Sequence, residues 1–210
     1  MERLRPPLAP FPERPPDWYD GFAYPDGPLI GQDGWTADFS LDDSPDVAGG
    51  TILCPLSGTG GASNGTALAG VDFDGDWLLE VDLIPPATAD GSTFLVVDLG
   101  DPLGRSLGLI LTTLGDDAEW WTVSLGVSDP TVSLPSSIIV PFRKGTPYTL
   151  GVRVVGSTIT LEVQRVPLLA GTLTMLLDLD GTQADIVLGG TTPAMCPAVD
   201  AISFWQPPPF

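Results

Sequence analysis

The stretch that decides the fold is PYTLGVRVVGSTITLEVQ, residues 147–164. On both sides of the Gly156-Ser157 pair, apolar residues alternate with polar or small ones. A period of two is typical of a half-buried β-strand, and a two-residue link that contains glycine is typical of a tight hairpin turn. The sequence therefore predicts a β-hairpin with a type II′ turn. Its apolar positions are Tyr148, Leu150, Val152, Val154, Ile159, Leu161 and Val163.

Similar patterns recur along the chain, most clearly in WLLEVDLI (77–84). Further strands are expected at 35–40, 51–54, 66–73, 93–99, 106–112, 119–127, 137–140, 172–177, 185–188 and 199–205. No segment has a sustained helical period with caps at both ends, although LLAGTLTMLLDL (168–179) is ambiguous. About a dozen short strands separated by turns predict an all-β protein, a two-sheet antiparallel β-sandwich of the jelly-roll type.

Charge and residue types limit the classes of function. The chain has 27 acidic and 8 basic residues, a formal net charge of −19, which disfavours binding to nucleic acid or to anionic membranes. It has no histidine, which excludes Ser-His-Asp and Cys-His catalysis and zinc sites of the Cys/His kind. Catalysis, if present, would have to use carboxylates. No run of eighteen apolar residues is present, so no membrane insertion is expected.

The two ends of the chain are rich in proline. Residues 1–20 hold six prolines and three of the basic residues, which favours an extended arm, and no secretory signal is expected there. The folded domain is expected at 21–206, followed by a short tail at 207–210. The arm also carries large apolar residues, so we expect it to lie on a partner or a neighbouring subunit and not to be an idle tail. These residues are Leu4, Leu8, Phe11, Trp18 and Tyr19.

The two cysteines, Cys54 and Cys196, fit no metal or redox spacing. They form either one bridge or two free thiols, and the spacing does not decide between these. The glycine-rich stretch SGTGGASNGT (57–66) lacks the lysine and the helix of a phosphate loop, so it is expected to be a long surface loop.

Three aspartates, Asp72, Asp74 and Asp76, lie within VDFDGD (71–76). Calcium binds clustered carboxylates around a glycine turn, but this spacing differs from that of an EF-hand loop. An acidic surface turn is therefore the favoured interpretation, with calcium as the alternative. No other cofactor is expected.

Two adjacent tryptophans, Trp120 and Trp121, lie in a predicted strand. Because side chains alternate along a strand, one indole must face the core and the other must face outward. The outward indole would suit a sugar platform or a protein interface. Packing in the core or between subunits is the favoured role for the pair.

Three segments carry a resemblance to known proteins. GTPYTLGVRVVGSTITLEV (145–163) resembles the central hairpin of laminin-G-like and concanavalin-A-like jelly-roll domains. VDAISFW (199–205) is similar to their closing strand, and YPDGPLIGQDGWT (24–36) is similar to their opening segment. The resemblance implies recognition of glycans or proteins, with glycoside hydrolysis in a minority. It also implies that the first and last strands pair, which would bring Cys54 and Cys196 near each other.

The lichenase-like hydrolases of this fold carry E-x-D-x-x-E on one strand. Glu80 and Asp82 match the first two positions, but Pro85 occupies the third. A retaining glycosidase needs two carboxyl groups roughly 5–5.5 Å apart, and this strand does not supply the second. The sequence therefore predicts that the protein is not an enzyme, and that Glu80 and Asp82 are surface carboxylates.

The predicted function is that of a non-enzymatic structural protein of a tailed bacteriophage virion, either a capsid decoration protein or a minor tail protein. The proline-rich arm, the missing catalytic set and the presence of Lys144 as the only lysine favour it. Its partners would be other virion proteins or its own subunits, and its location the virion, assembled in the host cytoplasm. The alternative is a lectin-like carbohydrate-binding module, calcium-assisted, that contacts a cell-surface glycan.

Overall fold

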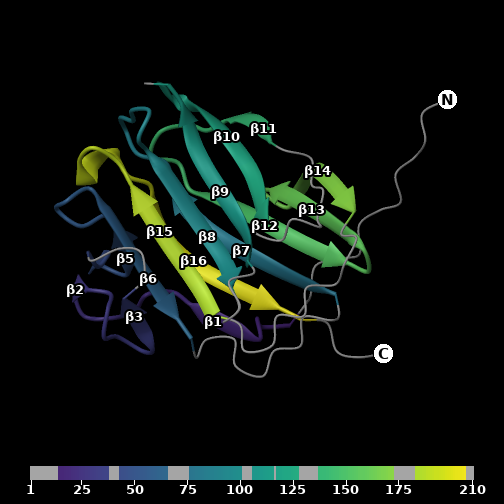
Figure 1. The fold of residues 1–210 in the computed structure, drawn as a ribbon, viewed down its shortest axis with the longest axis horizontal. Helices are drawn as coiled ribbons and strands as arrows, with labels where there is room; N and C mark the ends of the chain where they lie inside the picture. Colours follow the sequence, from purple (N-terminus) through teal and green to yellow (C-terminus); the bar gives the residue numbers. More distant parts are fainter. Residues whose placement is uncertain are drawn as a thin grey trace.

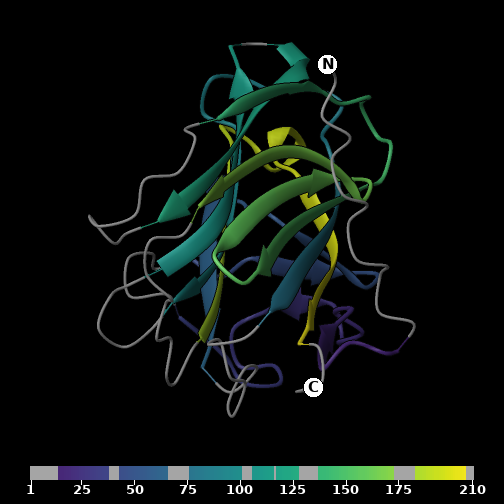
Figure 2. The same cartoon turned by 90° about the vertical axis from the view of Figure 1, so that its right-hand side faces the viewer.

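A computed structural model describes residues 14–37, 43–65, 76–100, 106–115, 117–127, 137–172 and 183–206. Two antiparallel sheets pack face to face (Figures 1 and 2). The all-β sandwich predicted from the sequence is therefore confirmed. Among the described residues the only helix is the 3-10 turn η1 (Pro193–Met195), and no helix there is long and apolar enough to cross a membrane.

The first sheet, called sheet A, has nine strands in the order β14-β13-β12-β7-β16-β5-β4-β2, with β1 also paired to β16. The strands are β1 (Trp18–Asp20), β2 (Gly27–Pro28), β4 (Asp46–Ala48), β5 (Thr51–Leu53), β7 (Trp77–Ile84), β12 (Tyr148–Val155), β13 (Thr158–Val163), β14 (Val166–Thr172) and β16 (Ala198–Trp205).

The second sheet, called sheet B, has seven strands in the order β11-β10-β9-β8-β15-β6-β3. The strands are β3 (Trp35–Ala37), β6 (Thr59–Asn64), β8 (Phe94–Gly100), β9 (Ser106–Leu114), β10 (Asp117–Val127), β11 (Ile138–Pro141) and β15 (Gln183–Gly189). Neighbours in this sheet come from distant parts of the chain, as β8 and β15 show (Figure 1).

The hairpin at 147–164 forms as predicted. Strands β12 and β13 pair with Val155 opposite Thr158, and Gly156 has a positive φ of 54° in the turn between them. A second tight turn follows at Gln164 and Arg165, whose φ angles are 51° and 62°, and it leads into β14. The described part of the ambiguous segment 168–179 is thus a strand, because it pairs with the edge of β13.

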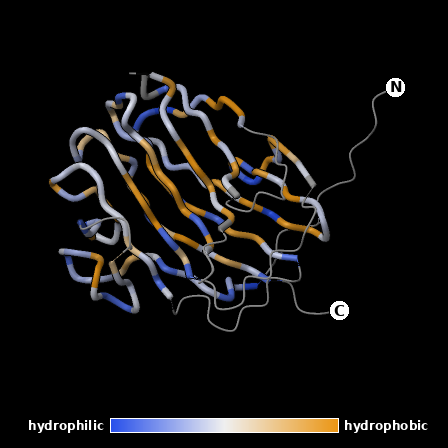
Figure 3. Tube along the Cα trace, in the orientation of Figure 1, coloured by the Kyte–Doolittle hydropathy of each residue, from blue (hydrophilic) through white to orange (hydrophobic). Residues whose placement is uncertain are grey.

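The core lies between the sheets and is built from one face of every long strand. Figure 3 shows the hydrophobic colour concentrated along the central strands. Trp77 stacks on Phe204 with ring centroids 5.9 Å apart, and Trp121 packs against Phe142. One core therefore holds both sheets as a single unit.

The opening segment YPDGPLIGQDGW (24–35) is fixed by a buried aspartate, Asp20. One carboxylate oxygen accepts the Phe22 backbone N–H, and the other accepts the Tyr24 hydroxyl and the Trp35 indole N–H, each at 2.8 Å. Burial raises the pKa of Tyr24, and its hydrogen bond to Asp20 adds to this shift. The segment is a structural lead-in to β3.

The predicted arm is partly inside the sandwich. Trp18 and Tyr19 lie in β1, which pairs with β16, and Trp18 packs against the core. Leu4, Leu8 and Phe11 lie outside the described residues.

The predicted loop at 57–66 is wrong over most of its length, because Thr59–Asn64 form strand β6. A Cβ at Gly60 would lie 2.7 Å from the Pro55 ring, so glycine serves close packing here and not flexibility.

Candidate functional site

Two clusters of acidic residues lie on the outer faces of the two sheets. The first is on sheet A and contains the E-x-D pair of the sequence. Glu80 is 5% exposed and forms a two-point ion pair with Arg165, with N–O distances of 3.3 and 3.4 Å. Asp82 accepts a hydrogen bond from the Thr149 hydroxyl. Glu80 is therefore a buried, ion-paired group and not the surface carboxylate that was predicted.

A second ion pair lies beside the first. Glu162 on β13 binds Arg153 on β12 at 2.6 Å, and both side chains are buried. Gly151 lies between Glu162 and Glu80 and adds no side chain, so the two carboxylates share one face. Burial raises the pKa of Glu80, Arg165 opposes the shift, and the charges of Asp82 and Glu162 add to it. Two carboxylates are thus matched by two guanidinium groups, and removing one partner of the buried Arg153–Glu162 pair would leave an uncompensated buried charge.

The second cluster is on the outer face of sheet B. Asp98 on β8 lies directly opposite Asp185 on β15 (the strands are side by side in Figure 1). Both side chains are half-buried, and the residues flanking each in its strand are buried in the core, so both aspartates face outward. Directly opposed side chains in antiparallel strands have Cβ atoms roughly 4.5–5.5 Å apart, and like charges in that position are destabilising. The placement brings two carboxylates together, and Oδ2 of Asp185 accepts a hydrogen bond from the Gln183 side-chain amide at 3.2 Å.

On the neighbouring strands, small residues lie directly opposite the two aspartates. Ser63 lies opposite Asp185, and Gly108 lies opposite Asp98. A Cβ at Gly108 would lie 2.3 Å from the Asp98 Cβ, and a Cβ at Gly100 would lie 3.1 Å from Oδ2 of Asp185. The glycines leave room that these two carboxylates occupy.

Further along the same strands, the outer face of sheet B carries apolar side chains. Phe94, Val96, Ile110 and Val187 point outward and are all half-buried. The face thus combines carboxylate acceptors with an apolar surface. A ligand that has hydroxyl groups and apolar C–H faces, as a pyranose does, is complementary to both parts.

The tryptophan pair divides as predicted. Trp121 is fully buried, and Trp120 is 45% exposed on the outer face of sheet B. Across the sheet, Gly126 on β10 lies opposite Gly108 on β9, which lies opposite Asp98 on β8. Trp120 is six residues before Gly126 on β10, and at roughly 3.4 Å per residue it is about 20 Å along the strand from the row that contains Asp98. The structure places Trp120 on the same face as the aspartates but at its far end.

The predicted calcium residues are only partly visible. Asp72 and Asp74 lie outside the described residues, and Asp76 accepts the backbone N–H of Gly156 at 2.7 Å. Within the described ranges no group of three or more acidic or cysteine side chains is arranged to hold a metal ion.

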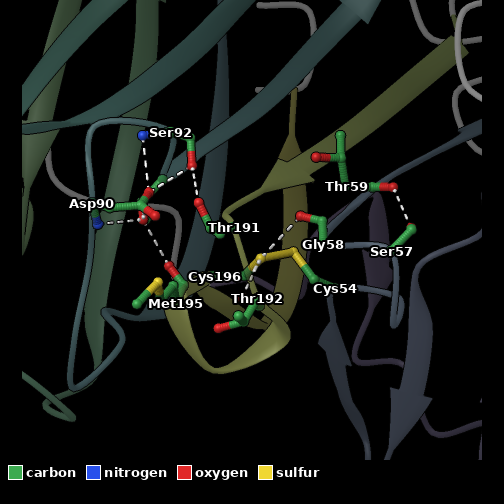
Figure 4. The surroundings of a disulfide bond; sticks show 11 residues. Cys54, Ser57, Gly58, Thr59, Asp90, Ser92, Thr191, Thr192, Met195 and Cys196 are labelled. Atoms are coloured by element: carbon green, nitrogen blue, oxygen red, sulfur yellow. Dashed lines mark hydrogen bonds between the residues drawn. A yellow bond between two sulfur atoms is a disulfide. The ribbon is translucent and has the colours of Figure 1, made fainter.

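The two cysteines form a disulfide between the end of β5 and the start of β16, with Cα atoms 6.1 Å apart (Figure 4). The Cys196 sulfur lies 3.5 Å from the Gly58 carbonyl oxygen, and Gly58 also accepts the Gly190 N–H. On the neighbouring loop, hydrogen bonds from Ser92, Thr191 and Thr93 lower the pKa of Asp90 to about 2. The bridge that the sequence left open is therefore present and joins two loops, and hydrogen bonds between Ser92 and Thr191 and from Thr93 to the Met195 carbonyl oxygen link the third loop to them.

Comparison with known proteins gives matches in structure only. No protein-family model matches the chain, and no curated protein matches it in sequence. A mutant of SCLam, a non-specific endo-β-1,3(4)-glucanase of family GH16, superposes with a TM-score of 0.66 at 12% identity over 96% of this chain and 98% of that one. A laminarinase from Flavobacterium sp. UMI-01 gives 0.61 at 9% identity over 91% and 100%, respectively. The Emp47p carbohydrate recognition domain gives 0.58 at 11% identity over 86% and 94%. The chain shares the concanavalin-like jelly-roll sandwich of these proteins.

These matches contradict two predictions from the sequence. The structural relatives are glucanases and a carbohydrate recognition domain, so the predicted virion protein has no support and the carbohydrate-binding alternative is favoured. The prediction that the protein is not an enzyme is also contradicted, since several of the matched proteins are glucanases. That prediction considered only carboxylates on one strand, and the fold that the chain shares with glucanases is not visible in the spacing along a single strand.

Asp98 and Asp185 were not among the residues selected from the sequence. Each is a single acidic residue in a strand that otherwise alternates in the ordinary way, FLVVDLG and QADIVLG. The signal in the sequence is an outward-facing aspartate in two predicted strands, but nothing local shows that these strands are neighbours.

Proposed function

We propose that this protein binds a glycan chain on the outer face of sheet B, centred on Asp98 and Asp185. The observation that carries the proposal is the direct opposition of these two aspartates, with Gly100 and Gly108 leaving room for them. Carboxylates are strong acceptors for sugar hydroxyls, and the half-buried Phe94 and Val96 offer apolar surface beside them.

The structural relatives support β-linked glucan as the first ligand class to test. The SCLam mutant was crystallised with 1,3-β-D-cellotriosyl-glucose and presents 1,3-β-D-cellobiosyl-glucose at its active site. The negative charge of the protein narrows the class of glycan further. A net charge of −19 and two central carboxylates would repel glycans that carry uronate or sulfate groups, so the ligand is a neutral glycan.

Affinity electrophoresis in gels containing laminarin, lichenan or a sulfated polysaccharide tests this proposal. We expect retardation by a neutral β-glucan, none by the sulfated one, and loss of retardation in Asp98→Asn/Asp185→Asn. The matched control is Asp82→Asn on the outer face of sheet A, which should migrate like the wild type. Equal retardation of the double variant and the wild type would overturn the proposal.

Glycoside hydrolysis at the same site is a second candidate function. The cross-strand register places the two Cβ atoms roughly 4.5–5.5 Å apart, which is compatible with the 5–5.5 Å carboxyl separation of retaining glycosidases. In this reaction one carboxylate attacks the anomeric carbon while the other carboxyl group protonates the leaving oxygen, and water then releases the sugar.

Release of reducing ends from laminarin and lichenan separates the two candidates. If the protein is a hydrolase, Asp98→Asn and Asp185→Asn each abolish release, while Glu80→Gln on sheet A retains it. Binding without any release, in the wild-type protein, would leave a carbohydrate-binding protein and reject hydrolysis of these glucans.

A further inference from the structure

One corner of sheet B exposes three large apolar side chains. Leu114 on β9 is 51% exposed, Trp120 on β10 is 45% exposed and Ile139 on β11 is 53% exposed. Ile139 lies opposite Thr122, and Trp120 lies opposite Pro141, so the three side chains lie on neighbouring strands and face outward. The other large apolar residues that are exposed among the described ones lie elsewhere: Tyr19, Leu53, Leu56, Val155 and Val166.

This corner is poorly suited to a second copy of the chain. A stable protein interface buries about 800 Å² on each partner, which is far more than three side chains supply. A net charge of −19 also opposes self-association. The indole ring, with aliphatic side chains beside it, instead presents a small apolar surface of the size of one sugar ring.

The corner is continuous with the proposed glycan face. From Trp120 toward the aspartates, the outward positions of β10 are Thr122, Ser124 and Gly126. Thr112 on β9 lies beside Thr122 and is exposed. Hydroxyl groups therefore line the path between the indole and the carboxylates, and hydroxyls both donate and accept hydrogen bonds.

We infer that Trp120 forms a second sugar-binding position, which stacks on a pyranose of the same chain whose other end reaches Asp98 and Asp185. This inference rests on the proposed function. It assigns the ligand class as an extended polysaccharide, because the two positions are about 20 Å apart and a disaccharide does not span them.

Calorimetric titration with laminaribiose and laminarihexaose tests the inference. For the hexasaccharide, Trp120→Ala should weaken binding roughly threefold to tenfold, and Trp120→Phe should retain most of the affinity. For the disaccharide, both variants should bind like the wild type. The matched control is Tyr19→Ala, which removes an exposed aromatic side chain from sheet A and should bind both sugars normally.

Four outcomes would overturn the inference. Unchanged hexasaccharide binding by Trp120→Ala removes the second position but leaves the proposed function intact. An equal loss of affinity for both sugars shows that Trp120 affects binding of short and long chains alike, and does not form a separate position for a longer chain. A dimeric wild type that becomes monomeric in Trp120→Ala, measured by light scattering, assigns the corner to a subunit contact. Absence of binding to either sugar in the wild type rejects both the inference and β-1,3-glucan as the ligand.

Discussion

The outer faces of the two sheets use acidic residues in opposite ways. On sheet A, Glu80 and Glu162 are buried, and each is bound by an arginine. On sheet B, Asp98 and Asp185 lie opposite each other and are half-buried. On sheet A each carboxylate is matched by a guanidinium group, whereas on sheet B two carboxylates are brought together across neighbouring strands. The carboxylate that was selected by its spacing along one strand, Glu80, is ion-paired with Arg165, and the pair that we propose as the glycan site depends on pairing between strands.

The largest loss of stability is expected when the disulfide is removed, because the bridge supports the whole sandwich and neither outer face in particular. Cys54 and Cys196 are separated by 142 residues, and loop-closure entropy assigns such a bridge about 5 kcal/mol. Cys54→Ser/Cys196→Ser should therefore lower the free energy of unfolding by up to that amount, measured by urea denaturation. A loss of binding in the still-folded variant, without a loss of stability, would show that the bridge serves only the site.

The second largest loss of stability is expected on sheet A, and it should leave glycan binding on sheet B unchanged. Arg153→Ala should lower the free energy of unfolding by about 3–5 kcal/mol, because it leaves the buried Glu162 carboxylate without its 2.6 Å ion-pair partner. Glycan binding by the folded fraction should persist. A change below 1 kcal/mol in urea denaturation would contradict the structural role assigned to the sheet A cluster.

A smaller effect is expected at Gly108. The new methyl group of Gly108→Ala would clash with Asp98, so the variant should lose about 1–3 kcal/mol of stability together with most of its glycan affinity. Gly91→Ala is the matched control, because a Cβ at Gly91 meets no atom within 4 Å. Normal binding by Gly108→Ala would show that the position of Asp98 is not critical.

The smallest effect concerns pH. Because burial raises the pKa of Glu80 above its usual value, the folded state binds the proton more tightly than the unfolded state does. The stability that this proton provides is present below the unfolded pKa near 4.5 and is lost as the pH rises through the folded value. Glu80→Gln should flatten this part of the stability-against-pH curve, measured by urea denaturation at successive pH values. An unchanged curve would mean that Glu80 ionises as freely as in the unfolded chain.

The sequence predicts the parts of this molecule that depend on local pattern. The hairpin at 147–164, the inward Trp121 and the outward Trp120 all follow from period-two alternation. Strand β6 was missed because Gly60 serves packing against Pro55, which no local pattern reveals. The pairing of Asp98 with Asp185 was missed for the same kind of reason, since strand order depends on the whole chain.

The double variant Asp98→Asn/Asp185→Asn tests the difference between the faces most directly, when stability and glycan binding are measured on the same sample. Asparagine keeps the shape of each side chain while removing the charge, so the melting temperature should change less than in Arg153→Ala, while retention of neutral β-glucan is lost. A fall in the melting temperature as large as that of Arg153→Ala, with glycan binding retained by the folded protein, would contradict the account. It would assign the sheet B pair, like the sheet A pairs, to the structure.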